Sequence, residues 1–258
     1  MPDALSLAAQ DFGDVSKKRR IVIAHGLFGA GRNWGVIAKR LAGDRRVTTV
    51  DMRNHGDSPW SDNHDYPSMA ADLAALIDEP VHVIGHSMGG KAAMALALMY
   101  PEKVDKLVVA DIAPVTYSHT QMSVLDAMAG LSLSGIDRRS EANERLSDTL
   151  PDPGVRAFVL QSLDIANHRW SLNLDTLRAE MPKIMSFPQM SGSFFGPSLF
   201  LAGGNSDYVK TEQQPGILAL FPNALFQTIP DAGHWLHAEN PRAFEASVST
   251  FLDGTTPG

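Results

Sequence analysis

The amino-acid sequence predicts an α/β fold in which helices cover both faces of a mostly parallel central sheet. Two observations support this prediction. Short, continuous apolar runs are typical of strands buried on both faces, and the first half of the chain contains several of them. A segment with helical spacing follows most of these runs, and such alternation favours parallel strands joined by right-handed crossovers. The 258 residues are enough for one large domain of this class.

The strand and helix pattern repeats three times in the first half of the chain. It predicts strands over residues 21–24, 46–52, 81–84 and 107–110, and helices over residues 33–41, 68–77 and 88–100. Asn33 is a plausible N-cap for the first helix, and Ser68 opens the second. The third helix is rich in Ala, Leu and Met, which indicates that it is buried.

The pattern changes at about residue 114. From there to about residue 197 the sequence has helical spacing and many methionines, without runs of β-branched residues. Strand-like sequence returns at residues 198–202 and 225–229, and an amphipathic helix follows at residues 241–252. We therefore predict a core domain made of residues 1–113 and 197–258, with a helical insertion formed by residues 114–196.

The composition is that of an ordinary globular protein with an acidic balance. The formal net charge of −7 gives no basic surface for nucleic acid, so we expect no nucleic-acid partner. The chain has no cysteine, which excludes disulfides and a thiol nucleophile. No apolar run approaches the roughly 18 residues that a membrane span needs, and the first five residues lack the pattern of a secretory signal. We therefore expect a cytoplasmic protein without a membrane span.

The segment Gly85-His86-Ser87-Met88-Gly89 lies between a predicted strand and a predicted helix. A serine at such a junction sits in a sharp turn that projects its hydroxyl from the carboxyl edge of the sheet. Glycine is needed on both sides because a Cβ there would collide with the neighbouring strand and helix. The helix N-terminus also favours the negative charge that develops on a substrate. Ser87 is therefore the candidate nucleophile.

A serine hydroxyl is a poor nucleophile at neutral pH and needs a base. In the chain order Ser, acid, His, the base follows the last strand. His234 occupies this place, between the predicted strand that ends at Ile229 and the final helix. Acyl transfer also needs two donors for the oxyanion. We assign them to the backbone N–H groups of Met88, which follows the nucleophile, and of Leu27, in the loop after the first predicted strand.

Two aspartates compete as the acid that orients His234. Asp207 follows the strand predicted over residues 198–202, and Asp111 follows the strand that ends at Ala110. A carboxylate at the end of a buried strand needs a partner. An aspartate that only caps a loop is the alternative for either residue, so both remain candidates.

Four segments carry a family likeness: His25-Gly26, residues 51–59, residues 85–91 and residues 111–114. Together they resemble the YbfF-type bacterial esterases of the α/β-hydrolase superfamily, and the likeness extends over residues 10–253. The resemblance implies that the insertion is a helical cap placed after the sixth strand. It also implies hydrolysis of acyl esters, including acyl thioesters such as acyl-CoA, through an acyl-enzyme and without a cofactor. It slightly favours Asp111 as the acid.

Four side chains near these positions are candidates to line the substrate site: His25, Phe28, His86 and Trp235. Isolated tryptophans are also common packing residues. The Met and Leu residues of the insertion suit an adaptable pocket for short to medium acyl chains, although helix packing explains them equally well. No metal site is expected, because the sequence has no His-Glu-x-x-His motif and no close cluster of histidines and carboxylates. The expected partner is thus a small acyl ester or thioester, and the oligomeric state stays open.

Other functions fit part of the same pattern. A serine on this scaffold also supports C–C bond hydrolysis and cofactor-free haloperoxidase activity. A ligand-binding receptor on this fold would be expected to lose a member of the triad. Because candidates for all three members are present, the sequence favours an ester hydrolase over a receptor.

Overall fold

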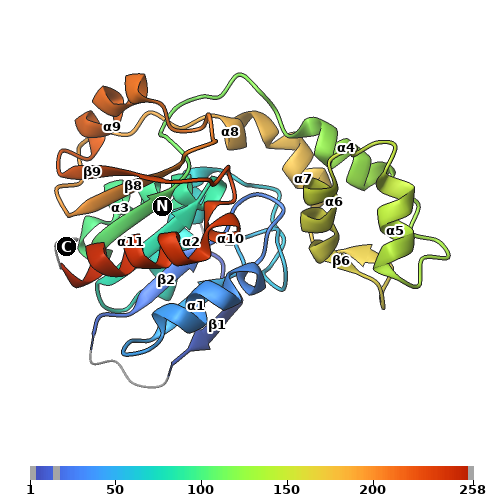
Figure 1. Cartoon of the computed structure of the whole chain (residues 1–258), viewed down its shortest axis with the longest axis horizontal. Coiled ribbons are helices and arrows are strands. Elements are labelled where there is room, and N and C mark those ends of the chain that lie inside the picture. Colours follow the sequence, from blue (N-terminus) through green and yellow to red (C-terminus); the bar gives the residue numbers. More distant parts are fainter. Residues whose placement is uncertain (1–3, 14–17, 255–258) are drawn as a thin grey trace.

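The computed structural model describes residues 4–13 and 18–254. Within them, seven strands form one central sheet with the order β1-β3-β2-β4-β5-β8-β9 (Figure 1). These strands are β1 (Ala9–Phe12), β2 (Ile21–Ala24), β3 (Val47–Val50), β4 (Val81–His86), β5 (Val104–Ala110), β8 (Ser198–Gly203) and β9 (Ala224–Ile229). All neighbouring pairs are parallel except β1 and β3. The predicted sheet is confirmed. The predicted boundaries of the core domain at residues 1 and 258 lie outside the described residues, and so do residues 1–3 of the segment that was used to predict localisation.

Helices cover both faces of the sheet. In β2, Val22 and Ala24 belong to one apolar cluster, whereas Ile21 and Ile23 belong to the other. Helices α2 (Tyr66–Leu76), α3 (Met88–Met99) and α9 (Gln214–Leu220) contribute to the first cluster, and α1 (Gly35–Leu41), α10 (Leu236–Glu239) and α11 (Pro241–Asp253) contribute to the second. Burial on both faces explains why these strands have continuous apolar sequences instead of alternating ones.

Two predicted helix starts are wrong, each because a nearby side chain caps the backbone differently. Asn33 does not cap α1; it lies in a 3₁₀ turn (Gly31–Trp34), and its Oδ1 accepts the N–H of Ala30 at 2.6 Å. Ser68 does not open α2, because Asp65 is the N-cap and accepts the N–H of Ser68 at 2.8 Å. The helix therefore begins two residues earlier, at Tyr66.

Residues 114–196 lie between β5 and β8, and most of their regular secondary structure is helical. They contain α4 (Met122–Gly130), α5 (Arg139–Leu146), α6 (Pro153–Val159), α7 (Leu174–Ala179) and α8 (Met181–Met185), together with a short antiparallel ribbon of β6 (Leu163–Asp164) and β7 (Arg169–Trp170) that the sequence did not predict. Figure 1 shows most of these elements grouped at one side of the molecule, joined to the sheet by α8 and by the chain that precedes α4.

The resemblance implied that this insertion follows a sixth strand. In the described residues it follows the fifth strand, β5, because a single strand, β1, precedes β2. The parallel strands bring their carboxyl ends to one edge of the sheet. Ser87 and Asp111 follow β4 and β5 directly at this edge, and the loop that contains His234 follows β9.

Candidate active site

Ser87 stands in the turn between β4 and α3. Its backbone has φ +52° and ψ −121°, a left-handed conformation that non-glycine residues rarely adopt and that often marks a functional constraint. A Cβ at Gly85 would lie 2.3 Å from the carbonyl oxygen of Gly89, and a Cβ at Gly89 would lie 2.4 Å from that of Ala24. Because backbone atoms make both contacts, the turn needs glycine at both positions.

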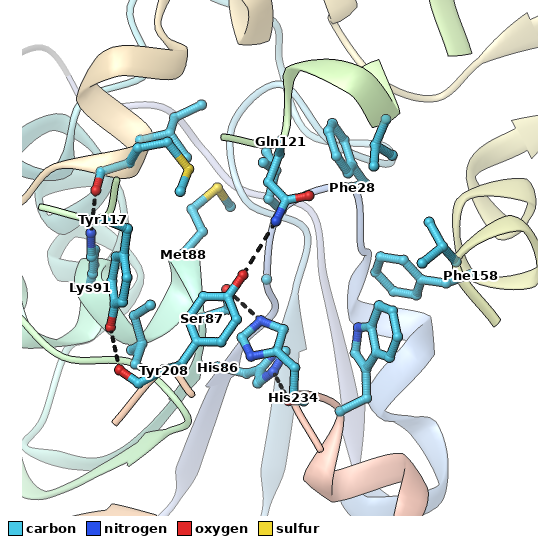
Figure 2. A pocket seen from close by; sticks show the side chains of 18 of the residues that line it. Phe28, His86, Ser87, Met88, Lys91, Tyr117, Gln121, Phe158, Tyr208 and His234 are labelled. Carbon is cyan, nitrogen blue, oxygen red and sulfur yellow. Dashed lines mark hydrogen bonds between the residues drawn. The ribbon is translucent and has the colours of Figure 1, made fainter. Parts of the chain in front are cut away.

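His234 lies between Ser87 and a buried carboxylate. Its Nε2 is 3.1 Å from Oγ of Ser87 (Figure 2), and its Nδ1 is 2.7 Å from Oδ2 of Asp111. An ionised carboxylate only accepts hydrogen bonds, so Nδ1 carries the proton and donates to Asp111. Nε2 is then free to accept the hydroxyl proton of Ser87. The structure thus brings together these three residues in one chain of hydrogen bonds.

Asp111 is fully buried at the end of β5. Its Oδ1 accepts the N–H of Gly203 at 2.9 Å, and its Oδ2 accepts the hydroxyl of Ser206 at 2.5 Å in addition to His234. Hydrogen bonds from several donors stabilise an ionised carboxylate that burial alone would destabilise. These bonds hold the Asp111 carboxylate in the orientation that a histidine partner requires.

Asp207 does not lie at His234. Its side chain is 99% exposed, and its Oδ1 is 4.0 Å from Nζ of Lys210. The loop after β8 directs Ser206 toward Asp111 and leaves Asp207 in solvent. Of the two aspartates that the sequence left open, the structure places only Asp111 against the histidine.

Two aromatic side chains hold His234 in place. The Nε2–H group of His86 donates to the backbone carbonyl of His234 at 2.8 Å, and burial lowers the pKa of His86 well below its ordinary value, so this ring is neutral. The ring of Tyr208 stacks on His234 with centroids 3.9 Å apart (Figure 2). The sequence did not predict Tyr208 and Ser206 as site residues. The feature that could have indicated them is their position next to Asp207, in the same polar loop.

The N–H groups of Leu27 and Met88 remain the candidate oxyanion donors. Leu27 lies in a turn that a hydrogen bond from Gly29 N–H to the carbonyl of Gly26 closes at 3.0 Å, and Met88 is the first residue of α3. Within the described part of the chain, neither N–H group has a hydrogen-bond partner. Both residues line the same cavity as Ser87, so both stay candidates for an oxyanion hole.

His25, which the sequence offered as a substrate-site candidate, is not among the residues that line the cavity at Ser87. The side chain is buried beneath the loop, where Nδ1–H donates to the carbonyl of Gly26 at 2.8 Å and Nε2 accepts the N–H of Met52 at 3.0 Å. Burial lowers its pKa to about 4, which keeps the ring neutral and able to accept. His25 therefore ties the loop after β2 to the chain after β3.

Residues 51–59, which carry part of the family likeness, support the same loop. Oδ1 of Asp51 accepts the N–H of Gly31 at 2.7 Å, and its Oδ2 accepts the N–H of Asp57 at 2.8 Å. Arg53 forms a buried, bidentate ion pair with Asp72 at 2.7 and 2.8 Å. Asp51 thus connects residues 51–59 to the loop after β2, and Arg53 connects them to α2. These contacts indicate a structural role for both residues.

A largely apolar cavity of about 230 Å³ opens onto Ser87. Three of the candidate substrate-site residues, Phe28, His86 and Trp235, line it. Its other apolar walls come from the core and the insertion: Leu27, Met88, Ile112, Val124, Val155, Phe158, Val159, Ile184 and Met185. The rings of Trp235 and Phe158 are neighbours in the cavity wall, with centroids 5.4 Å apart. The insertion thus contributes much of the surface that faces the serine (Figure 2).

Comparison with known proteins gives the family. A profile described as "Alpha/beta hydrolase family" matches residues 21–247, which is most of the sequence. The chain belongs to the α/β hydrolase family. A solved structure described as a marine microorganism esterase superimposes on this α/β hydrolase with a TM-score of 0.91 and 37% sequence identity, covering 96% of this chain and 100% of that one.

Curated relatives narrow the likeness further. This α/β hydrolase is 43% identical to the sn-1-specific diacylglycerol lipase ABHD11 of Mus musculus, over 90% of this chain and 80% of that protein. It is 38% identical to esterase YbfF of Escherichia coli K12, over 96% of this chain and 99% of that protein. The predicted resemblance to YbfF-type esterases is confirmed, and so is the prediction of a carboxylic ester hydrolase. Among the described residues, no helix is long and apolar enough to cross a membrane.

Proposed function

We propose that this α/β hydrolase cleaves carboxylic esters of short to medium acyl chains through an acyl-enzyme on Ser87. The observation that carries the proposal is the hydrogen-bonded chain from Ser87 through His234 to Asp111 at the mouth of an apolar cavity. This arrangement supplies a nucleophile, a base and an orienting carboxylate in the geometry that acyl transfer uses.

Acylation begins when Oγ of Ser87 attacks the ester carbonyl and Nε2 of His234 takes its proton. Asp111 stabilises the imidazolium that forms, and the face of Tyr208 lies against this ring. The N–H groups of Leu27 and Met88 hold the oxyanion, at about 3 kcal/mol for each donor. His234 then donates its proton to the leaving alcohol, and the acyl group stays on Ser87.

Deacylation repeats these steps with water. Nε2 of His234 takes a proton from water as the water oxygen attacks the acyl carbonyl. The tetrahedral intermediate collapses, the carboxylic acid leaves, and the proton on His234 returns to Oγ of Ser87. The same two N–H groups serve both steps, because the oxyanion forms in the same place.

The cavity supports the choice of acyl chain. Its volume of about 230 Å³ lies just below the roughly 300–1,000 Å³ of sites for drug-sized ligands, so a short or medium chain fills it. The proposal treats residues 114–196 as a cap, since Val124, Val155 and Phe158 come from this segment and face the serine. Acyl thioesters such as acyl-CoA are included, because attack at a thioester carbonyl uses the same groups.

A panel of p-nitrophenyl esters and acyl-CoAs of increasing chain length tests the proposal. The wild type should hydrolyse the shorter esters, and Ser87→Ala should lower kcat by at least about 10³-fold with unchanged folding, as removal of a triad nucleophile does elsewhere. Hydrolysis that survives in Ser87→Ala would refute the serine mechanism. Absence of ester and thioester hydrolysis in the wild type would favour C–C bond hydrolysis, haloperoxidase activity or a receptor.

A further inference from the structure

Lys91 is a buried cation close to the nucleophile. It lies one helical turn after Ser87 in α3, and its backbone N–H donates to the backbone carbonyl of Ser87 at 3.1 Å. The side chain is only 1% exposed and forms part of the wall of the acyl cavity. The steps proposed for ester hydrolysis do not use it.

The ammonium group of Lys91 joins the two ends of the insertion. Nζ donates to the carbonyl of Val115 at 2.9 Å, where the chain leaves the core. It also donates to the carbonyls of Met185 and Ser186, at 3.1 and 2.6 Å, where the chain returns. An ammonium group has three donors, so these bonds use all of them and leave none for a substrate.

A lysine is a costly choice for this position. Burial lowers its pKa to about 7 because the charged form is poorly solvated. Among the described residues no carboxylate forms an ion pair with it. The rings of Tyr117 and Tyr66 lie 4.9 and 5.7 Å from Nζ, and Figure 2 shows Lys91 beside Tyr117. A methionine would pack in this apolar wall without that penalty. The three carbonyl bonds are what the lysine adds.

Other hydrogen bonds hold the same two connecting segments, residues 113–118 and 184–188, which together form the joint between the insertion and the core. The two connecting segments bond to each other through Tyr117 N–H and the carbonyl of Met185, at 3.0 Å. The hydroxyl of Tyr66, in α2, donates to the carbonyl of Ile184 at 2.5 Å. Ile184 and Met185 themselves line the acyl cavity. A shift of this joint therefore moves the cavity wall relative to Ser87.

We propose that Lys91 is a positioning residue that fixes both connections of the insertion to α3 and thereby sets the size of the acyl cavity. This inference rests on the proposed function for its effect on chain length. Its structural part, the fixing of residues 113–118 and 184–188, stands without it.

The experiment compares Lys91→Met with the matched control Lys106→Met. Nζ of Lys106 also donates to backbone carbonyls, those of Phe251 and Leu252 at 3.0 and 2.9 Å, and also lies near an aromatic ring. These bonds are at the end of α11, which packs on the opposite face of the sheet. The two substitutions therefore remove the same chemistry from different places.

Two readouts follow the joint. Hydrogen–deuterium exchange of residues 113–118 and 184–188 should be faster by about tenfold in Lys91→Met, because local opening loses bonds to a charged donor. The preference between successive p-nitrophenyl ester chain lengths should fall by about tenfold, through KM, because a loosened apolar pocket no longer discriminates a methylene group. Lys106→Met should leave both readouts at wild-type values.

Wild-type exchange at both segments in Lys91→Met would overturn the proposal, and so would equal changes in Lys106→Met. If Lys91→Met does not fold, Lys91→Gln serves instead. Its amide keeps a polar group in the cavity wall but has two N–H donors and not three, so it cannot make all the carbonyl bonds of Lys91 and should accelerate exchange at residues 113–118 or 184–188. No acceleration there would also overturn the proposal. Exchange needs no substrate, so this test remains decisive if the chain proves not to be an esterase.

Discussion

Replacement of Asp111 by Asn isolates the role of the carboxylate while keeping its shape. In the wild type, Oδ2 accepts from both Ser206 and His234, and Oδ1 accepts from Gly203. An amide group in place of Oδ2 is a donor, so it favours the His234 tautomer with its proton on Nε2. That tautomer cannot take the proton of Ser87. We expect kcat/KM to fall by about 10⁴-fold, as in other triads, which corresponds to about 5.4 kcal/mol of transition-state stabilisation.

The matched control is Asp207→Asn, because this side chain is 99% exposed and does not reach His234. It should keep kcat/KM within about threefold of the wild type, since exposed substitutions far from reacting groups change free energies by about 0.5 kcal/mol. The assay is hydrolysis of a p-nitrophenyl ester, with circular dichroism to show that each variant is folded. A larger loss in Asp207→Asn than in Asp111→Asn would refute the reasoning.

Two further predictions concern stability. Gly89→Ala should destabilise the fold by about 3 kcal/mol, measured by urea unfolding, because the new Cβ would lie 2.4 Å from the carbonyl oxygens of Ala24 and His25; an unchanged midpoint would contradict the geometry. His237 is buried and stacked on Trp34, and burial lowers its pKa to about 3. In the unfolded chain the His237 ring binds a proton near pH 6.5, whereas in the folded chain it binds one only near pH 3. The contribution of His237 to the free energy of unfolding is therefore complete above pH 6.5 and is lost as the pH falls toward 3. In His237→Phe the fall in unfolding free energy between pH 6 and 4.5 should be smaller by up to about 1.4 kcal/mol per pH unit, and an unchanged slope would show that His237 is not responsible.

The sequence predicted the parts of the fold and site that depend on local pattern. Strands buried on both faces have recognisable apolar runs, so β2, β4, β5 and β8 were predicted close to their observed positions. β1 was not, because it is a short edge strand whose side chains are mostly exposed and carry no apolar signal. Ser87 and His234 were predicted as site residues because each has a fixed place relative to a strand.

The parts that depend on contacts between distant segments were not predictable in this way. Asp111 and Asp207 both follow strands at the same sheet edge, and only the path of each loop decides which carboxylate faces His234. His25 has the right place for a pocket residue, but its ring turns inward to Met52. The side chain of Lys91 bonds to Val115, Met185 and Ser186, which are separated from it in sequence by 24, 94 and 95 positions. No local sequence pattern encodes these partners.

Covalent labelling of Ser87 tests the central claim most directly. An organophosphonate should react once per chain, and peptide mapping by mass spectrometry should place the adduct on Ser87, with parallel loss of ester hydrolysis and no labelling of Ser87→Ala. In the proposed mechanism His234 activates this hydroxyl and the N–H groups of Leu27 and Met88 stabilise the charge that develops, so the reaction should proceed at neutral pH. A folded wild-type protein in which Ser87 stays unlabelled would contradict the account.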